Sequence, residues 1–140
     1  MISSWGSIRW FKPVEFDSPD LPGSGEANMS LDLIDKLDQI RDLVGKPLII
    51  TSGFRTYAHN KVIGGKPNSA HLRGFAADVF IGNDDTLRLA VLKASISVGI
   101  VRFEIAPVHI HLDVDKGLTQ NVVVFLPSYE QVGRLVNQGS

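Results

Sequence analysis

The spacing of apolar residues along the chain predicts two long helices. From Ser30 onward, apolar residues recur every three or four positions, and Ser30 is a typical helix-capping residue. Gly45 is expected to end this helix, because glycine readily adopts the left-handed conformation that follows a last helical turn. A second helix is expected to begin at Asn83 or Asp84 and to run through Ser97. Two shorter helices are predicted near Tyr57–Val62 and Ser128–Val136.

Five short apolar runs rich in β-branched residues predict strands. They cover residues 48–51, 75–81, 100–105, 108–114 and 122–126. The third and fourth runs are joined by Ala106 and Pro107 alone, and a link this short makes them antiparallel neighbours. Because helices and strands are mixed along the chain, we expect an α+β fold with a small, mostly antiparallel sheet and helices on one side.

The first 29 residues follow neither pattern. Prolines and glycines interrupt any regular spacing there, and aromatic residues are frequent. We expect residues 1–29 to form an arm that packs on the domain and ends in a loop. The packing is assigned to four aromatic side chains, Trp5, Trp10, Phe11 and Phe16. The chain has the length of one domain and no repeat or linker, so residues 1–140 are expected to form a single domain.

Composition narrows the possible partners and metal sites. The chain has no cysteine, which leaves histidine and carboxylate as its strong metal ligands. A formal net charge of −1 gives no reason to expect nucleic acid as a partner. No segment approaches about 20 consecutive apolar residues, and the start of the sequence lacks the pattern of a secretory signal. We expect a monomer that is made in the cytoplasm without a signal peptide and has no membrane partner.

The segment 108–114 places three titratable residues on one face of a predicted strand. Side chains alternate between the faces of a strand, so its apolar residues share the core face. His109, His111 and Asp113 then project together from the other face. Such a rigid arrangement is typical of a functional site. A polar stripe that merely faces solvent is the alternative.

Asp78 is a second candidate, because it interrupts the apolar run 75–81. An unpaired carboxylate in that position would cost several kcal/mol, so it needs a metal, a cation or a hydrogen-bond network. His71 precedes it by seven residues and is close enough in the chain to reach the same point. Alternatively, Asp78 only forms an ion pair with Arg73 or Arg55.

Two histidines and one aspartate form a sensible catalytic zinc set. His71, Asp78 and His111 would leave the fourth tetrahedral position open for water. Nitrogen and oxygen ligands suit zinc, although manganese, iron and cobalt accept the same donors.

Several motifs in this region resemble the M15 zinc peptidases. These are the D-Ala-D-Ala carboxypeptidase-like enzymes, which are related to the lysostaphin-type and hedgehog-type zinc folds. The resemblance covers residues 48–115 and is carried by Ser52-Gly53-Phe54-Arg55, Asn60, Gly64-Gly65, Ser69-x-His71, Gly74, Ala77-Asp78 and His111-x-Asp113-Val114. It implies a hedgehog-like or peptidase-like fold with Zn²⁺ on the exposed face of the sheet, bound by His71, Asp78 and His111.

The resemblance also implies roles for residues around the metal. Arg55 matches an arginine that contacts substrate or steadies the carbonyl oxygen, which suits its permanently charged planar group. Ser69 matches a serine whose hydroxyl bonds substrate or a metal ligand. Asp113 resembles an acceptor that orients a histidine through the ring nitrogen turned away from the metal.

The general base departs from the family pattern. Many relatives have Glu or Asp three residues before the last zinc histidine, where this chain has Val108. Other relatives of the wider fold have a histidine two residues before the ligand, and His109 occupies that place. Histidine titrates near neutrality, so we favour His109 as the base. Glu104 on the neighbouring strand is the alternative.

The resemblance implies hydrolysis of an amide bond in peptidoglycan stem peptides. A compact bacteriophage endolysin, an endopeptidase that acts on the cell wall after the membrane is breached, is the favoured expectation. The alternatives are a D,D-carboxypeptidase or dipeptidase acting on D-Ala-containing peptides, and a non-catalytic zinc-stabilised binding or virion module.

Overall fold

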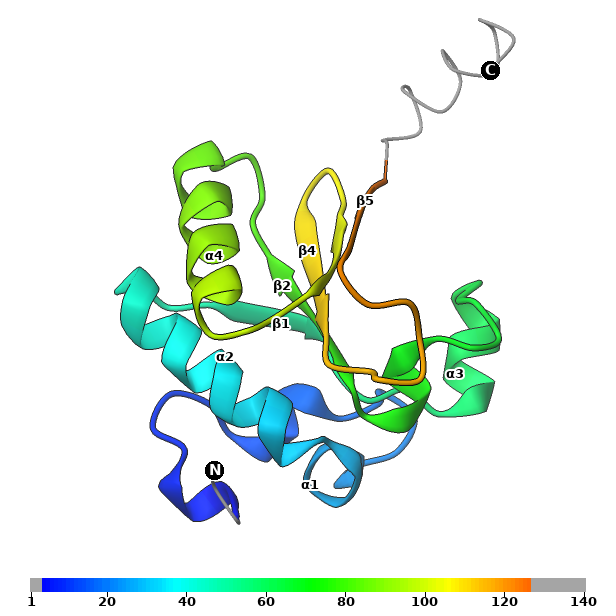
Figure 1. The fold of residues 1–140 in the computed structure, drawn as a ribbon. Coiled ribbons are helices and arrows are strands. Elements are labelled where there is room, and N and C mark those ends of the chain that lie inside the picture. Colours follow the sequence, from blue (N-terminus) through cyan, green and yellow to red (C-terminus); the bar gives the residue numbers. More distant parts are fainter. Residues whose placement is uncertain (1–3, 127–140) are drawn as a thin grey trace, which may run out of the picture.

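The computed structural model of the chain describes residues 4–126, and a five-stranded sheet forms its centre (Figure 1). The strand order is β1-β2-β4-β3-β5. The strands are β1 (Ile49–Ser52), β2 (Ala76–Phe80), β3 (Arg102–Ile105), β4 (His109–Asp113) and β5 (Val122–Phe125). All five lie within runs predicted as strands or within one residue of them, because those runs are short, apolar and bounded by turn residues.

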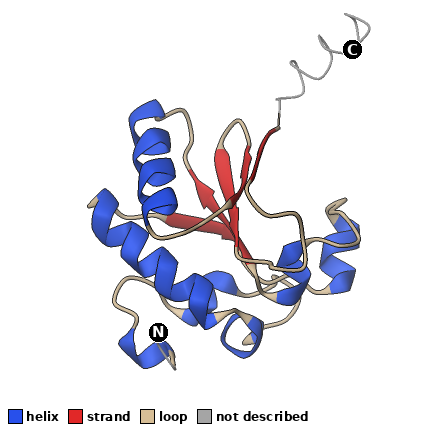
Figure 2. Cartoon of the chain, viewed as in Figure 1, coloured by secondary structure: helices blue, strands red, loops and turns tan. Residues whose placement is uncertain are grey.

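Helices flank the sheet, as the blue and red elements of Figure 2 show. The α-helices are α1 (Ser24–Asn28), α2 (Leu31–Val44), α3 (Tyr57–Val62) and α4 (Asp85–Ser97). Three short 3₁₀ helices are η1 (Trp5–Ser7), η2 (Pro13–Phe16) and η3 (Ala70–Arg73). The long helices α2 and α4 pack against each other on one face of the sheet (Figure 1). No helix within residues 4–126 is long and apolar enough to cross a membrane.

The predicted helix ends are confirmed by local capping interactions. The Ser30 hydroxyl accepts a hydrogen bond from the backbone N–H of Leu33, and Gly45 follows α2 in the left-handed conformation with φ of 74°. Asp84 caps α4 in the same manner as Ser30 caps α2. The helix predicted at Ser128–Val136 lies outside the described residues.

The sheet is mixed, which corrects the prediction of a mostly antiparallel sheet. β1 with β2, β2 with β4, and β3 with β4 pair antiparallel, whereas β5 runs parallel to β3. The parallel pairing of β5 with β3 results from the path of the segment between β4 and β5. β4 ends with Asp113 beside Arg102, and β5 begins with Val122 beside the same Arg102, so the chain crosses the end of β3 and returns in its direction.

Successive side chains along each strand point to opposite faces of the sheet, so one face contacts the core and the other is open. Val79, Ile110 and Leu112 are completely buried and belong to the hydrophobic core, together with apolar residues of α2 and α4. Their neighbours in sequence, such as Asp78 and His111, point to the opposite face. Val108 was expected on the core face, but it lies in the turn before β4 and is exposed.

The aromatic arm packs on the domain mainly through two phenylalanines. Phe11 and Phe16 are buried in the core, and the ring of Trp5 lies 5.7 Å from that of Phe16. Trp10 is more exposed, and its indole N–H donates to Asp42 on α2. The expected loop after the arm contains the short helix α1.

Candidate metal site

Three elements bring His71, Asp78 and His111 together. His71 lies in η3, Asp78 in β2 and His111 in β4. The Ser69 hydroxyl caps η3 by accepting a hydrogen bond from the His71 backbone N–H, and Gly74 ends it with φ of 74°. This single turn delivers the chain directly into β2. It therefore places His71 above the strand that carries Asp78.

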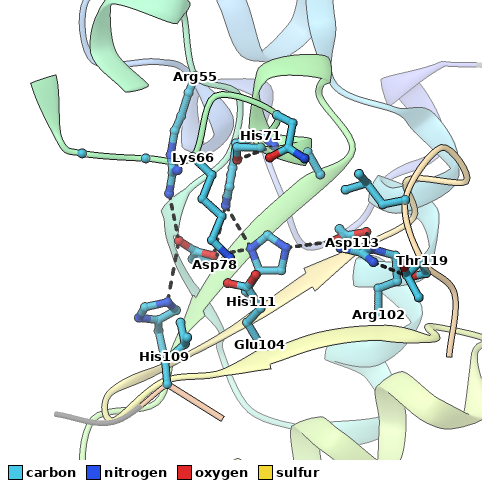
Figure 3. Close-up of a pocket in the computed structure, with 17 residues that line it drawn as sticks. Arg55, Lys66, His71, Asp78, Arg102, Glu104, His109, His111, Asp113 and Thr119 are labelled. Carbon is cyan, nitrogen blue, oxygen red and sulfur yellow. Dashed lines mark hydrogen bonds and ion pairs between the residues drawn. The ribbon is translucent and has the colours of Figure 1, made fainter. Parts of the chain in front are cut away.

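The side chains of the three residues point toward one another (Figure 3). Their candidate ligand atoms are nearly equally spaced. Asp78 and His111 are cross-strand partners on β2 and β4. His71 Nε2, Asp78 Oδ1 and His111 Nδ1 lie 3.2 Å from one another. Donors at about 2.0–2.1 Å from a tetrahedral zinc ion lie about 3.3 Å apart, so the observed triangle has the size that such an ion requires.

The outer nitrogens of both histidines are occupied by acceptors. His71 Nδ1–H donates to the carbonyl oxygen of Gly53 at 2.7 Å, and His111 Nε2–H donates to Asp113 Oδ2 at 2.7 Å. A neutral imidazole has one N–H, so the lone pair of the other nitrogen points to the shared centre. When both histidines are neutral, two such lone pairs and a carboxylate oxygen converge there, and this donor set suits a bound cation.

Burial and hydrogen bonding set the charges of this group. Burial would raise the pKa of Asp78, but hydrogen bonds with His111 and His71 outweigh it and hold that pKa well below its ordinary value. Burial would lower the pKa of His111, but its bonds with Asp113 and Asp78 raise it to about 9. Burial lowers the pKa of His71. Near neutral pH in the metal-free protein, His111 therefore carries a second proton, on Nδ1, and a cation that binds there would displace it.

An open pocket of about 440 Å³ gives access to this group. Every residue predicted for the site lines it: Arg55, Ser69, His71, Asp78, Glu104, His109, His111 and Asp113. Glu104 on β3 is the cross-strand partner of His111, so Asp78, His111 and Glu104 form one row across three strands. His109 lies on the other side of Asp78, with Nε2 3.9 Å from Asp78 Oδ2 (Figure 3).

Arg55 lies beside the ligand group and is held from several sides. Its guanidinium donates to Ser52 Oγ at 3.0 Å and to Asn60 Oδ1 at 3.3 Å, and it approaches Asp78 Oδ2 at 3.4 Å. Gly65 makes this possible, because a Cβ there would lie 2.0 Å from Asn60 Oδ1. The predicted pairing of Asp78 with Arg55 thus coexists with its contacts to the histidines. The alternative partner Arg73 pairs instead with Asp115.

The pocket also contains residues that the sequence prediction missed. Arg102, Lys66, Leu118 and Thr119 all line it. Arg102 lies two residues before Glu104 in the same predicted strand, so their side chains share a face. This spacing was sufficient to place Arg102 on the open face. Thr119 lies in an irregular segment for which no periodic signal exists.

Comparison with known proteins gives a family match. Residues 16–113, more than half of the chain, match the family model described as Peptidase M15. This range includes the three metal-ligand candidates and the N-terminal part of the domain from Phe16. A search of curated proteins finds no match.

Proposed function

The chain belongs to the peptidase M15 family, and from this premise we propose that it is a zinc-dependent peptidase acting on peptidoglycan stem peptides. The ligand triangle of His71, Asp78 and His111 is the observation that carries the proposal. Its size and its donor set of two imidazole nitrogens and one carboxylate oxygen suit zinc, and three protein ligands would leave one coordination position for water. A zinc ion held by these three residues would supply Lewis acidity, which lowers the pKa of bound water and polarises a carbonyl group.

The residues around the metal supply the proton transfer and the charge stabilisation. We propose that His109 takes a proton from the attacking water and returns it to the leaving amine, with Glu104 as the alternative base. Both side chains line the pocket beside the ligands. Arg55 is positioned to stabilise negative charge on the carbonyl oxygen or to bind a substrate carboxylate. The Ser69 hydroxyl lines the pocket and accepts a hydrogen bond from the His71 backbone N–H, and we propose that its O–H donates to substrate.

Peptidoglycan as the substrate rests on the family resemblance, and the pocket is compatible with it. Lys66 and Glu104 bring charges of both signs to an open pocket, which suits peptides that carry both carboxylates and amines. Within this class we favour an endolysin-type endopeptidase, with a D,D-carboxypeptidase or dipeptidase as the alternative. One observation favours a non-catalytic zinc-stabilised module instead: the position of the usual acidic base is occupied by Val108, in the turn before β4.

The test combines metal content with turbidity of purified peptidoglycan. We expect about one zinc ion per chain, together with lysis that a chelator stops and added zinc restores. His111→Ala serves as the metal-site control. Zinc binding without lysis would direct the assay to D-Ala-D-Ala dipeptides. If these also remain uncleaved, the peptidase proposal is wrong and the binding module takes its place.

A further inference from the structure

Arg102 is a nearly buried cation on the open face of the sheet. It is the cross-strand partner of Asp113, and its side chain is 12% exposed. Figure 3 shows it beside Asp113 and Thr119, on the side of His111 that faces away from Asp78. The family resemblance assigns no role to this residue.

The Asp113 carboxylate, which holds His111, is fixed through both of its oxygens. Oδ2 accepts from His111 Nε2–H at 2.7 Å. Oδ1 accepts from Arg102 Nε–H at 2.6 Å and from the Asp115 backbone N–H at 3.1 Å. Rotation of the carboxylate about χ2 would break the bonds on both sides. The direction of the oxygen offered to His111 is therefore set in part by Arg102.

Arg102 is itself fixed from a second direction. Its Nη1–H donates to the backbone carbonyl of Thr119, in the segment that links β4 to β5. The guanidinium is planar and rigid, so contacts to Asp113 and Thr119 together determine its plane. A continuous chain of hydrogen bonds thus leads from the β4–β5 segment through Arg102 and Asp113 to His111.

We propose that Arg102 is a positioning residue of the metal site. By fixing the Asp113 carboxylate, it keeps the hydrogen of His111 on Nε2 and directs Nδ1 to the metal. This inference rests on the metal site of the proposed function and is independent of whether the protein cleaves peptide bonds. Groups that orient a metal-binding histidine commonly change metal affinity by about 10–100-fold.

The experiment measures zinc affinity by competition with a chromophoric chelator. Arg102→Ala is expected to weaken zinc binding about 10–100-fold, and Arg102→Lys by less, because lysine restores the charge but not the rigid fork. The visible spectrum of bound Co²⁺ reports ligand geometry, and we expect it to change in Arg102→Ala. The control is Arg88→Ala. Arg88 is similarly shielded and donates to the carbonyls of Ala106 and Pro107, away from the metal ligands.

The control separates positioning from general stability. Arg88→Ala should lower the melting temperature but leave zinc affinity within about twofold. Zinc affinity of Arg102→Ala within about twofold of wild type would overturn the inference. If Arg102→Ala does not fold, Arg102→Lys decides: an unchanged affinity and an unchanged Co²⁺ spectrum overturn it. Loss of affinity in the Arg102 variants, in a protein without peptidase activity, would contradict the proposed function and support this inference.

Discussion

The Nδ1–H of His71 donates to the carbonyl oxygen of Gly53 at 2.7 Å, which ties η3 to the residue that follows β1. Gly53 in turn lies against the N-terminal arm, because a Cβ at this position would be 2.6 Å from Phe16 Cα. The next residue, Phe54, donates its N–H to the Phe16 carbonyl. The arm therefore supports the orientation of a metal-ligand candidate from a distant part of the sequence.

A methyl group at Gly53 should disturb both packing and metal binding. We expect Gly53→Ala to reduce the free energy of unfolding by about 1–3 kcal/mol, because the backbone of Phe16 cannot yield as a flexible side chain would. The displaced carbonyl should also weaken zinc binding. Thermal unfolding and zinc titration measure the two effects. Gly6→Ala is the control, since its Cβ would approach only Ser4 Oγ, at 3.4 Å. Wild-type values for Gly53→Ala would contradict the packing argument.

Removal of either histidine ligand should abolish stoichiometric zinc binding. His71→Ala and His111→Ala each leave two of the three donors, and we expect the rise in melting temperature on zinc addition to disappear. Metal analysis after gel filtration provides the second measurement. His59→Ala is the matched control, because His59 lies on α3 and is not among the described residues that line the pocket. Full zinc occupancy in either ligand variant would refute the assignment.

The two candidate bases can be separated from the metal ligands by their effect on turnover. His109→Ala should retain zinc and reduce kcat by about 10²–10⁴-fold, as expected for loss of a general base. Glu104→Ala should retain zinc with a smaller loss. The reverse ranking would make Glu104 the base. Unchanged turnover in both variants would refute the proton-transfer assignment.

Local signals in the sequence predict most of the elements. The cap at Ser30 and the stop at Gly45 depend on a few neighbouring residues, so the ends of α2 could be placed. The two-residue period likewise placed His109 and His111 on one face of β4. The candidate metal ligands were predicted from these local patterns together with the family resemblance, because spacing alone did not exclude a simple ion pair for Asp78.

Features that depend on the path of the chain could not be predicted. The apolar run at 122–126 indicates a strand, but its parallel pairing follows from the way the preceding segment crosses the end of β3. The bond between His71 and Gly53 joins η3 to a loop whose position depends on the arm. The Arg102–Asp113 pair requires the exact register of the β3–β4 hairpin.

An ion pair whose carboxylate is buried should contribute more stability than one whose carboxylate is exposed. Asp115 is almost completely buried and is paired with Arg73, which also donates to the carbonyl of Asn68. Arg73 itself is 38% exposed, so solvent screens part of the attraction. Arg73→Ala would leave the buried carboxylate without its cation, and we expect a loss of about 1–3 kcal/mol in the free energy of unfolding.

The pair of Lys36 and Asp32 on α2 serves as the comparison, because the Asp32 carboxylate is more exposed than that of Asp115. Lys36→Ala should cost less than about 1 kcal/mol. Chemical denaturation of the metal-free proteins measures both values. Equal effects of the two substitutions would show that burial of Asp115 does not control the strength of its pair.

Zinc binding should release about one proton at about pH 7, and the group responsible should be His111. In the metal-free protein the pKa of His111 is raised to about 9, so its Nδ1 carries a proton that the metal must displace. The pKa of Asp78 is held low and that of His71 is lowered by burial, so neither has a proton to release there. Zinc affinity should therefore rise about tenfold per pH unit between about pH 7 and 8.

Calorimetric titration of zinc in buffers with different ionisation enthalpies measures the number of protons released. Asp113→Asn supplies the control, because loss of the carboxylate that bonds His111 removes a cause of the raised pKa and should reduce proton release. The raised pKa of His111 also determines how the stability of the metal-free protein depends on pH. A raised histidine pKa stabilises the folded metal-free protein below about pH 6.5, and this contribution is lost as the pH rises towards 9. Zinc binding without proton release at about pH 7 would contradict the assignment of the proton to His111.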